Sequence, residues 1–137
     1  MSAATPARYL AVVAYQNSED RLNPVSPEGV DDTTMGGYPA VHGRAPAFEG
    51  VDGEPYTAAI EVERAADRTS WAAYLVFVRW AQTGSAVMGH LETADLAHGE
   101  SESEVRKMLE ALPLAQVREI LDVAIERKRR EAEEWGT

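Results

Sequence analysis

The chain lacks cysteine altogether, and it contains very little lysine. Among its 137 residues are 13 basic side chains, of which only Lys107 and Lys128 are lysines. The absence of thiols excludes disulfides, thiolate metal sites and a cysteine nucleophile. Without cysteine, the sequence also gives no indication of the redox compartment in which the protein works.

Long apolar runs are missing as well. No stretch approaches the roughly 18 to 20 apolar residues that are needed to cross a bilayer. The start of the chain has neither the basic head nor the small-residue cleavage site of a signal peptide. The net charge of −10 repels phosphate backbones and anionic lipids. We therefore expect a soluble, cytoplasmic protein that binds neither membranes nor nucleic acids.

Length and composition predict one domain over residues 1–137. A chain of this size can bury about two-thirds of its unfolded surface around a single core, and two domains would each be too small. With 45% apolar and 26% charged residues, the composition is that of a globular protein rather than a disordered one.

Four segments have the pattern of β-strands. In Arg8–Gln16, β-branched and aromatic residues occupy both faces, as in a strand covered on two sides. Tyr56–Arg64 alternates apolar and polar residues, which indicates a half-solvated strand. Ser70–Ala81 is the most apolar run of the chain, and a short turn joins it to Ala86–Thr93. Residues 70–93 are therefore expected to form a β-hairpin.

The pattern changes to a helical period in residues 101–135. A capping box begins at Ser101, where a Glu follows three positions later. Pro113 interrupts the first helical stripe, because proline is tolerated in the first turn of a helix but not in its interior. A second stripe then runs from Leu114 to Ile125 at steps of three and four residues. Two helices joined by an elbow are predicted.

The order of these segments predicts an α+β fold. We expect an antiparallel sheet of about four strands, with two C-terminal helices packed on one face and a long Gly/Pro-rich loop after the first strand. Strands precede helices instead of alternating with them, which argues against a doubly wound parallel sheet.

The long loop spans residues 17–55 and holds five of the seven prolines and six of the ten glycines. A loop of this length in a compact domain is usually functional or disordered. The apolar residues spread through it are expected to pin it to the sheet. As a partner-binding flap, it would offer Met35, Tyr38, His42 and Phe48 as binding residues. As a crossover, it would only join the first strand to the others.

The densest group of chemically capable side chains lies in the stretch GHLETADLAHGE. His90 and Glu92 share one face of a strand, which makes them candidates for acid–base catalysis. With His98, and with His42 from the long loop, they are also candidate metal ligands, because imidazole and carboxylate suit zinc or iron. Alternatively, His90 and Glu92 lie on a solvated strand face that is followed by a polar connector. In that case we expect no metal and no cofactor.

These features favour a small acidic protein-interaction module of the adaptor, chaperone or immunity type. Its protein partner would bind through the long loop, the C-terminal helix or both. A homodimer through the C-terminal helix is also considered, because a projecting amphipathic helix often packs against its symmetry mate. The alternative is a small metal-dependent or acid–base enzyme that uses the His/Glu cluster. Convergence of the histidines in one pocket would favour the enzyme, and their dispersion would favour the binding module.

Overall fold

The α+β class is confirmed in a computed structural model of the chain, which describes residues 29–136. The strand expected at Arg8–Gln16 lies outside the described residues. The elements in chain order are α3 (Gly37–His42), β1 (Ala47–Glu49), β2 (Pro55–Arg64), β3 (Trp71–Trp80), β4 (Val87–Glu92), β5 (Ala97–Gly99), α4 (Glu102–Glu110) and α5 (Leu114–Gly136).

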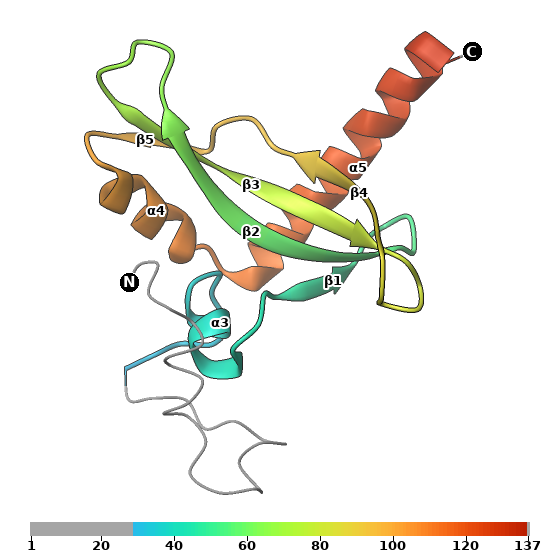
Figure 1. The fold of residues 1–137 in the computed structure, drawn as a ribbon, viewed down its shortest axis with the longest axis horizontal. Coiled ribbons are helices and arrows are strands. Elements are labelled where there is room, and N and C mark those ends of the chain that lie inside the picture. Colours follow the sequence, from blue (N-terminus) through green and yellow to red (C-terminus); the bar gives the residue numbers. More distant parts are fainter. Residues whose placement is uncertain (1–28, 137) are drawn as a thin grey trace, which may run out of the picture.

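An antiparallel meander of β2, β3 and β4 forms the centre of the fold (Figure 1). β1 extends it at the β2 edge, and β5 pairs with the first residues of β3. The expected hairpin over residues 70–93 is present, with Gly84 at a positive φ of 79° in its turn. A register shift between Arg79 and Trp80 marks a bulge, the kind of irregularity that bends a strand pair locally.

One face of the sheet carries the core. The alternation in β2 buries Tyr56 and Ala58, and in β3 it buries Leu75 and Phe77, which have no exposed surface. Each fully buried side chain of this size stabilises the fold by about 1.5–3 kcal/mol. The helical residues that complete this cluster are Val105, Leu109, Val117, Leu121 and Ile125.

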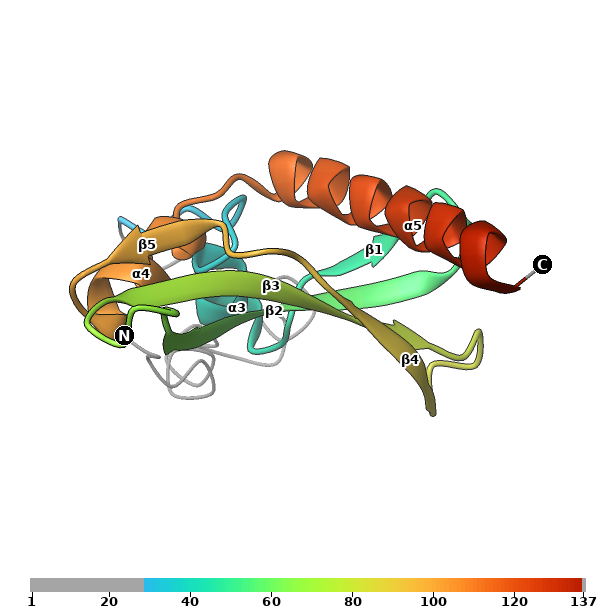
Figure 2. The same cartoon turned by 90° about the horizontal axis from the view of Figure 1, so that it is seen from above.

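Both C-terminal helices pack on this face, as the sequence predicts. Figure 2 shows α5 lying over the sheet as a separate layer. α4 begins after Ser101, whose hydroxyl oxygen accepts a hydrogen bond from the Glu104 amide at 3.1 Å. The return contact of the capping box is shifted by one residue, because the Glu104 carboxylate accepts from the Glu100 amide at 2.8 Å. Beyond Ile125, α5 has an exposed surface, and its last turns project past the sheet (Figure 1).

The described part of the long loop contains regular structure that the sequence pattern does not indicate, namely α3 and β1. Just before α3, its backbone binds the elbow between α4 and α5. The Met35 amide donates to the Leu112 carbonyl at 2.9 Å, and the Gly36 amide donates to the Glu110 carbonyl at 3.0 Å. These contacts provide partners for carbonyl groups that the end of a helix leaves unpaired.

The Leu114 amide, at the start of α5, donates to the Thr33 carbonyl at 2.8 Å. We call this pairing of residues 31–36 with residues 110–114 the clasp. A second connection lies further along α5, where the Val51 amide donates to an Asp122 carboxylate oxygen at 2.9 Å. The loop therefore holds α5 at its first turn and again near its middle.

Candidate functional site

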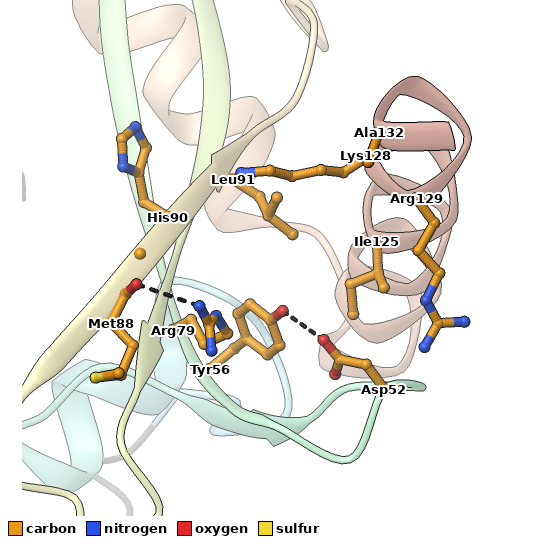
Figure 3. Close-up of a pocket in the computed structure, with 11 residues that line it drawn as sticks. Asp52, Tyr56, Arg79, Met88, His90, Leu91, Ile125, Lys128, Arg129 and Ala132 are labelled. Carbon is orange, nitrogen blue, oxygen red and sulfur yellow. Dashed lines mark hydrogen bonds between the residues drawn. The ribbon is translucent and has the colours of Figure 1, made fainter. Parts of the chain in front are cut away.

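A cleft of about 300 Å³ lies between β4 and the second half of α5 (Figure 3). This volume is at the lower end of the range for ligand pockets in proteins. Leu91 and Ile125 contribute apolar surface from the two sides. Charged side chains of β3 and α5 complete the lining, and Tyr56 and Asp52 close one end of it.

The Tyr56–Asp52 pair is a fixed part of this lining. Tyr56 is only 3% exposed, and its hydroxyl donates to Asp52 Oδ2 at 2.8 Å. Asp52 Oδ1 accepts from the Glu54 amide at 3.0 Å. Burial, together with the hydrogen bond to Asp52 and the charge of that carboxylate, raises the pKa of Tyr56, so its phenol stays protonated at neutral pH. Both oxygens of Asp52 are therefore engaged within the protein.

Arg79 provides a cation on the strand side of the cleft. One of its terminal nitrogens donates to the Met88 carbonyl at 3.2 Å. The guanidinium lies over Gly89, where an added Cβ would sit 3.6 Å from that nitrogen. Within the described residues, no carboxylate forms an ion pair with Arg79. Most of its five N–H donors are therefore available to a ligand.

Lys128 and Arg129 provide cations on the helix side. Figure 3 shows the Lys128 side chain reaching from α5 toward β4, and its ammonium has no ion-pair partner in residues 29–136. Arg129, in contrast, binds the Glu126 carboxylate at 3.0 Å. The cleft thus presents two cations that form no ion pair within residues 29–136, together with one carboxylate, Asp52, in a chain whose net charge is −10.

The three histidines are dispersed over the structure. His90 lies opposite Val78, and His98 lies opposite Ala72, on the same central strand. These two positions are six residues apart along β3, which corresponds to about 20 Å at 3.3 Å per residue. His42 lies at the end of α3. They therefore do not line a common pocket.

Each histidine instead has one carboxylate neighbour, and no group of three or more His, Asp or Glu residues within the described residues could hold a metal ion. The candidate ligand set of His42, His90, Glu92 and His98 is thus not brought together. The pairs, measured from Nε2 to the carboxylate oxygen, are His42–Asp32 at 3.2 Å, His90–Glu92 at 3.7 Å and His98–Asp95 at 3.9 Å.

The binding residues predicted in the long loop lie in two environments. Met35 is 3% exposed and belongs to the core, and Phe48 packs against that core from β1. Tyr38 and His42 are half-buried, with ring centroids 4.2 Å apart, and Arg44 donates to the Tyr38 hydroxyl at 2.9 Å. A binding role for these four residues stays a prediction.

A second, apolar groove of about 400 Å³ follows another side of α5. Val123 and Ile120 line it from the helix, and Leu96 lines it from the β4–β5 connection. Val123 is 67% exposed and Leu96 is 41% exposed. Val123 is absent from the core stripe that the sequence predicts, and its position midway between the buried Leu121 and Ile125 is the signal that it must face outward.

The cationic cleft is not identified by motif reasoning. Two signals were nevertheless present in the sequence. Arg79 interrupts the most apolar strand, and it lies on the same face of that strand as the buried Leu75 and Phe77, because residues two apart share a face. Lys128 is one of only two lysines. What the sequence alone cannot supply is that these two residues, 49 positions apart by their numbers, face the same cleft.

No helix within residues 29–136 is both long enough and apolar enough to cross a membrane. Comparisons of the chain with protein-family models, with curated proteins and with solved structures give no match.

Proposed function

We propose that this chain is a non-catalytic interaction module that binds an acidic segment of a partner protein in the cleft between β4 and α5. The observation that carries this proposal is the pair of cations on opposite sides of the cleft, Arg79 and Lys128, which form no ion pair in the described part of the chain. A planar guanidinium binds a carboxylate through two parallel hydrogen bonds, and an ammonium adds a strongly hydrated point charge. Together they suit a carboxylate held between strand and helix.

The lining of the cleft favours a peptide segment that is both acidic and apolar. Leu91 and Ile125 offer apolar surface beside the two cations, and Met88 is 54% exposed at the strand side. The volume suits one or two side chains rather than a long ligand. A nucleic acid is less suited, because the net charge of −10 repels an extended phosphate backbone at long range. We also propose that the protein acts in the cytoplasm.

The alternative, a small metal-dependent or acid–base enzyme, has less support. His90 is one of the residues that line the cleft, but Glu92 is not. The two side chains are 62% and 53% exposed, and His90 Nε2 lies 3.7 Å from the Glu92 carboxylate. Catalytic acids and bases are usually placed in a cleft where burial or a neighbouring charge tunes their pKa. A homodimer through the C-terminal helix is a separate proposal, because it uses another side of α5.

The proposal is tested by calorimetric titration of the intact chain with two hexapeptides. One peptide alternates glutamate with leucine, and the other replaces each glutamate by glutamine. We expect the acidic peptide to bind and the neutral one to bind at least tenfold more weakly, because hydrogen bonds between ionised partners are about twice as strong as neutral ones. Equal affinity for the two peptides, or no binding of either, would contradict the proposal.

The two lysines provide a matched pair of variants. Lys128→Glu places a carboxylate in the cleft and should weaken binding of the acidic peptide by at least tenfold. Lys107→Glu makes the same change of charge on the exposed surface of α4 and should leave the affinity within about twofold. If both substitutions weaken binding equally, the effect comes from overall charge, and the cleft is not the binding site.

A further inference from the structure

The exposed stripe of α5 around Val123 has no partner in the described part of the chain. Val123 is 67% exposed, and Ile120 and Leu96 continue the apolar surface into the groove of about 400 Å³. This stripe faces a different side of α5 from the cationic cleft, because neither Val123 nor Arg127 lines that cleft. An occupant of the groove would therefore leave the cleft open.

Two opposite charges flank Val123 at equal distances along the helix. Glu119 precedes it by four residues, and Arg127 follows it by four residues, which places each about 6 Å from Val123 along the helix axis. Both line the groove. Neither forms an ion pair within residues 29–136.

We propose that two copies of this chain associate through this stripe, with their α5 helices antiparallel and a two-fold axis beside Val123. In this arrangement, Glu119 of each copy faces Arg127 of the other, so one symmetric contact forms two ion pairs. A parallel arrangement would place Glu119 against Glu119 and Arg127 against Arg127. The charge pattern therefore selects both the occupant, a second copy, and its direction.

The same geometry covers the apolar surface. Val123 of one copy lies against Ile120 and Val123 of the other, and the partner helix also covers Leu96. A single helical stripe buries less surface than a standard stable interface of about 1,200–2,000 Å². The dimer therefore forms reversibly and depends on protein concentration. This inference is independent of the cationic cleft and goes beyond the proposed function.

Charge exchange tests the inference by sedimentation velocity over a series of protein concentrations. The unmodified chain should dimerise. Glu119→Arg places Arg against Arg in its own dimer, and Arg127→Glu places Glu against Glu. Each should weaken dimerisation by about tenfold, because two symmetric ion pairs are replaced by two repulsions.

Two further samples test the direction of the helices. The double variant Glu119→Arg/Arg127→Glu should dimerise as the unmodified chain does, since both ion pairs return with reversed sign. An equimolar mixture of the two single variants should form heterodimers, because one copy then presents two cations and the other two anions. Arg118→Glu is the control, because it makes the same change from arginine to glutamate as Arg127→Glu, but at an exposed position outside the groove. It should leave dimerisation unchanged.

If the unmodified chain is monomeric at the highest soluble concentration, the proposed dimer is wrong. Dimerisation that the double variant fails to restore overturns the antiparallel pairing, as does an equal loss in Arg118→Glu. Circular dichroism of every variant shows that the fold is kept, so that a loss of dimer is not a loss of structure.

Discussion

Gly37→Ala tests how tightly the clasp segment around Asp31 packs against the first residue of α3. A Cβ added at Gly37 would lie 1.7 Å from the Asp31 carbonyl oxygen, whereas contacts under 3.0 Å are essentially never seen for real Cβ atoms. Asp31 and Gly37 lie this close because the Thr34 hydroxyl bridges them. It donates to the Asp31 carbonyl and accepts from the Gly37 amide, each at 3.0 Å.

The cost of this substitution follows from those contacts. The Asp31 carbonyl must move by more than 1 Å from where the Cβ would lie, and overpacking of this kind typically costs about 1–3 kcal/mol. The movement also breaks the two hydrogen bonds of Thr34, which contribute about 0.5–1.5 kcal/mol each. Alanine returns about 0.5–1 kcal/mol, because it loses less backbone entropy than glycine in a helix. We expect the free energy of unfolding to fall by about 2–4 kcal/mol.

Urea denaturation followed by circular dichroism measures this loss. With an m-value of about 2 kcal/mol/M, the midpoint should shift by about 1–2 M. Gly89→Ala is the matched control, because its Cβ would meet only the Arg79 side chain at an ordinary 3.6 Å, and its stability should stay within about 0.5 kcal/mol. The reasoning is refuted if Gly37→Ala unfolds at the same urea concentration as the unmodified chain.

Three further predictions concern single hydrogen bonds and charges. Tyr56→Phe removes the hydrogen bond to Asp52 and should lower the free energy of unfolding by about 1.5 kcal/mol in urea; no change would mean that the pair does not stabilise the fold. A side-chain hydrogen bond with Asp95 raises the pKa of Glu63 above its ordinary value of 4.5. The protonated Glu63 carboxyl therefore stabilises the folded state below pH 4.5, and this contribution is lost as the pH rises through the raised pKa. Glu63→Gln should therefore be more stable than the unmodified chain at pH 7 and lose this advantage near pH 4; an advantage independent of pH would exclude the charge explanation. Ser101→Ala removes the N-cap of α4 and should cost about 1 kcal/mol, which a thermal melt would detect as a shift of a few degrees.

The strands and helices with a long, regular pattern could be predicted from the sequence. Tyr56–Arg64 alternates because one face of β2 meets the core and the other does not, and structure and pattern agree there. The elbow is equally visible, since Pro113 cannot continue α4. Trp71 packs against the core, whereas the Trp80 indole donates to the Thr57 hydroxyl at 2.9 Å, in keeping with the opposite faces that residues nine apart occupy in a strand.

The long loop and the site could not be predicted in the same way. α3 has six residues and β1 has three, which is too short for a periodic signal to emerge. Burial favours both elements, because Val41 of α3 has no exposed surface and Phe48 of β1 packs against the core. The cleft likewise depends on how α5 crosses the sheet, and the spacing of Arg79 and Lys128 along the chain carries no information about that crossing.

The clasp and the second connection, from Val51 to Asp122, also constrain how the protein is made. Val51 and Asp122 are 71 positions apart, and the clasp bonds of Thr33, Met35 and Gly36 reach across a comparable length of chain to the elbow. Bringing such distant segments together costs loop-closure entropy, so contacts of this kind slow folding. On the ribosome, the segment around Thr33 emerges well before its partners exist. These bonds cannot form until residues 110–122 have been synthesised, so the fold is incomplete without α5.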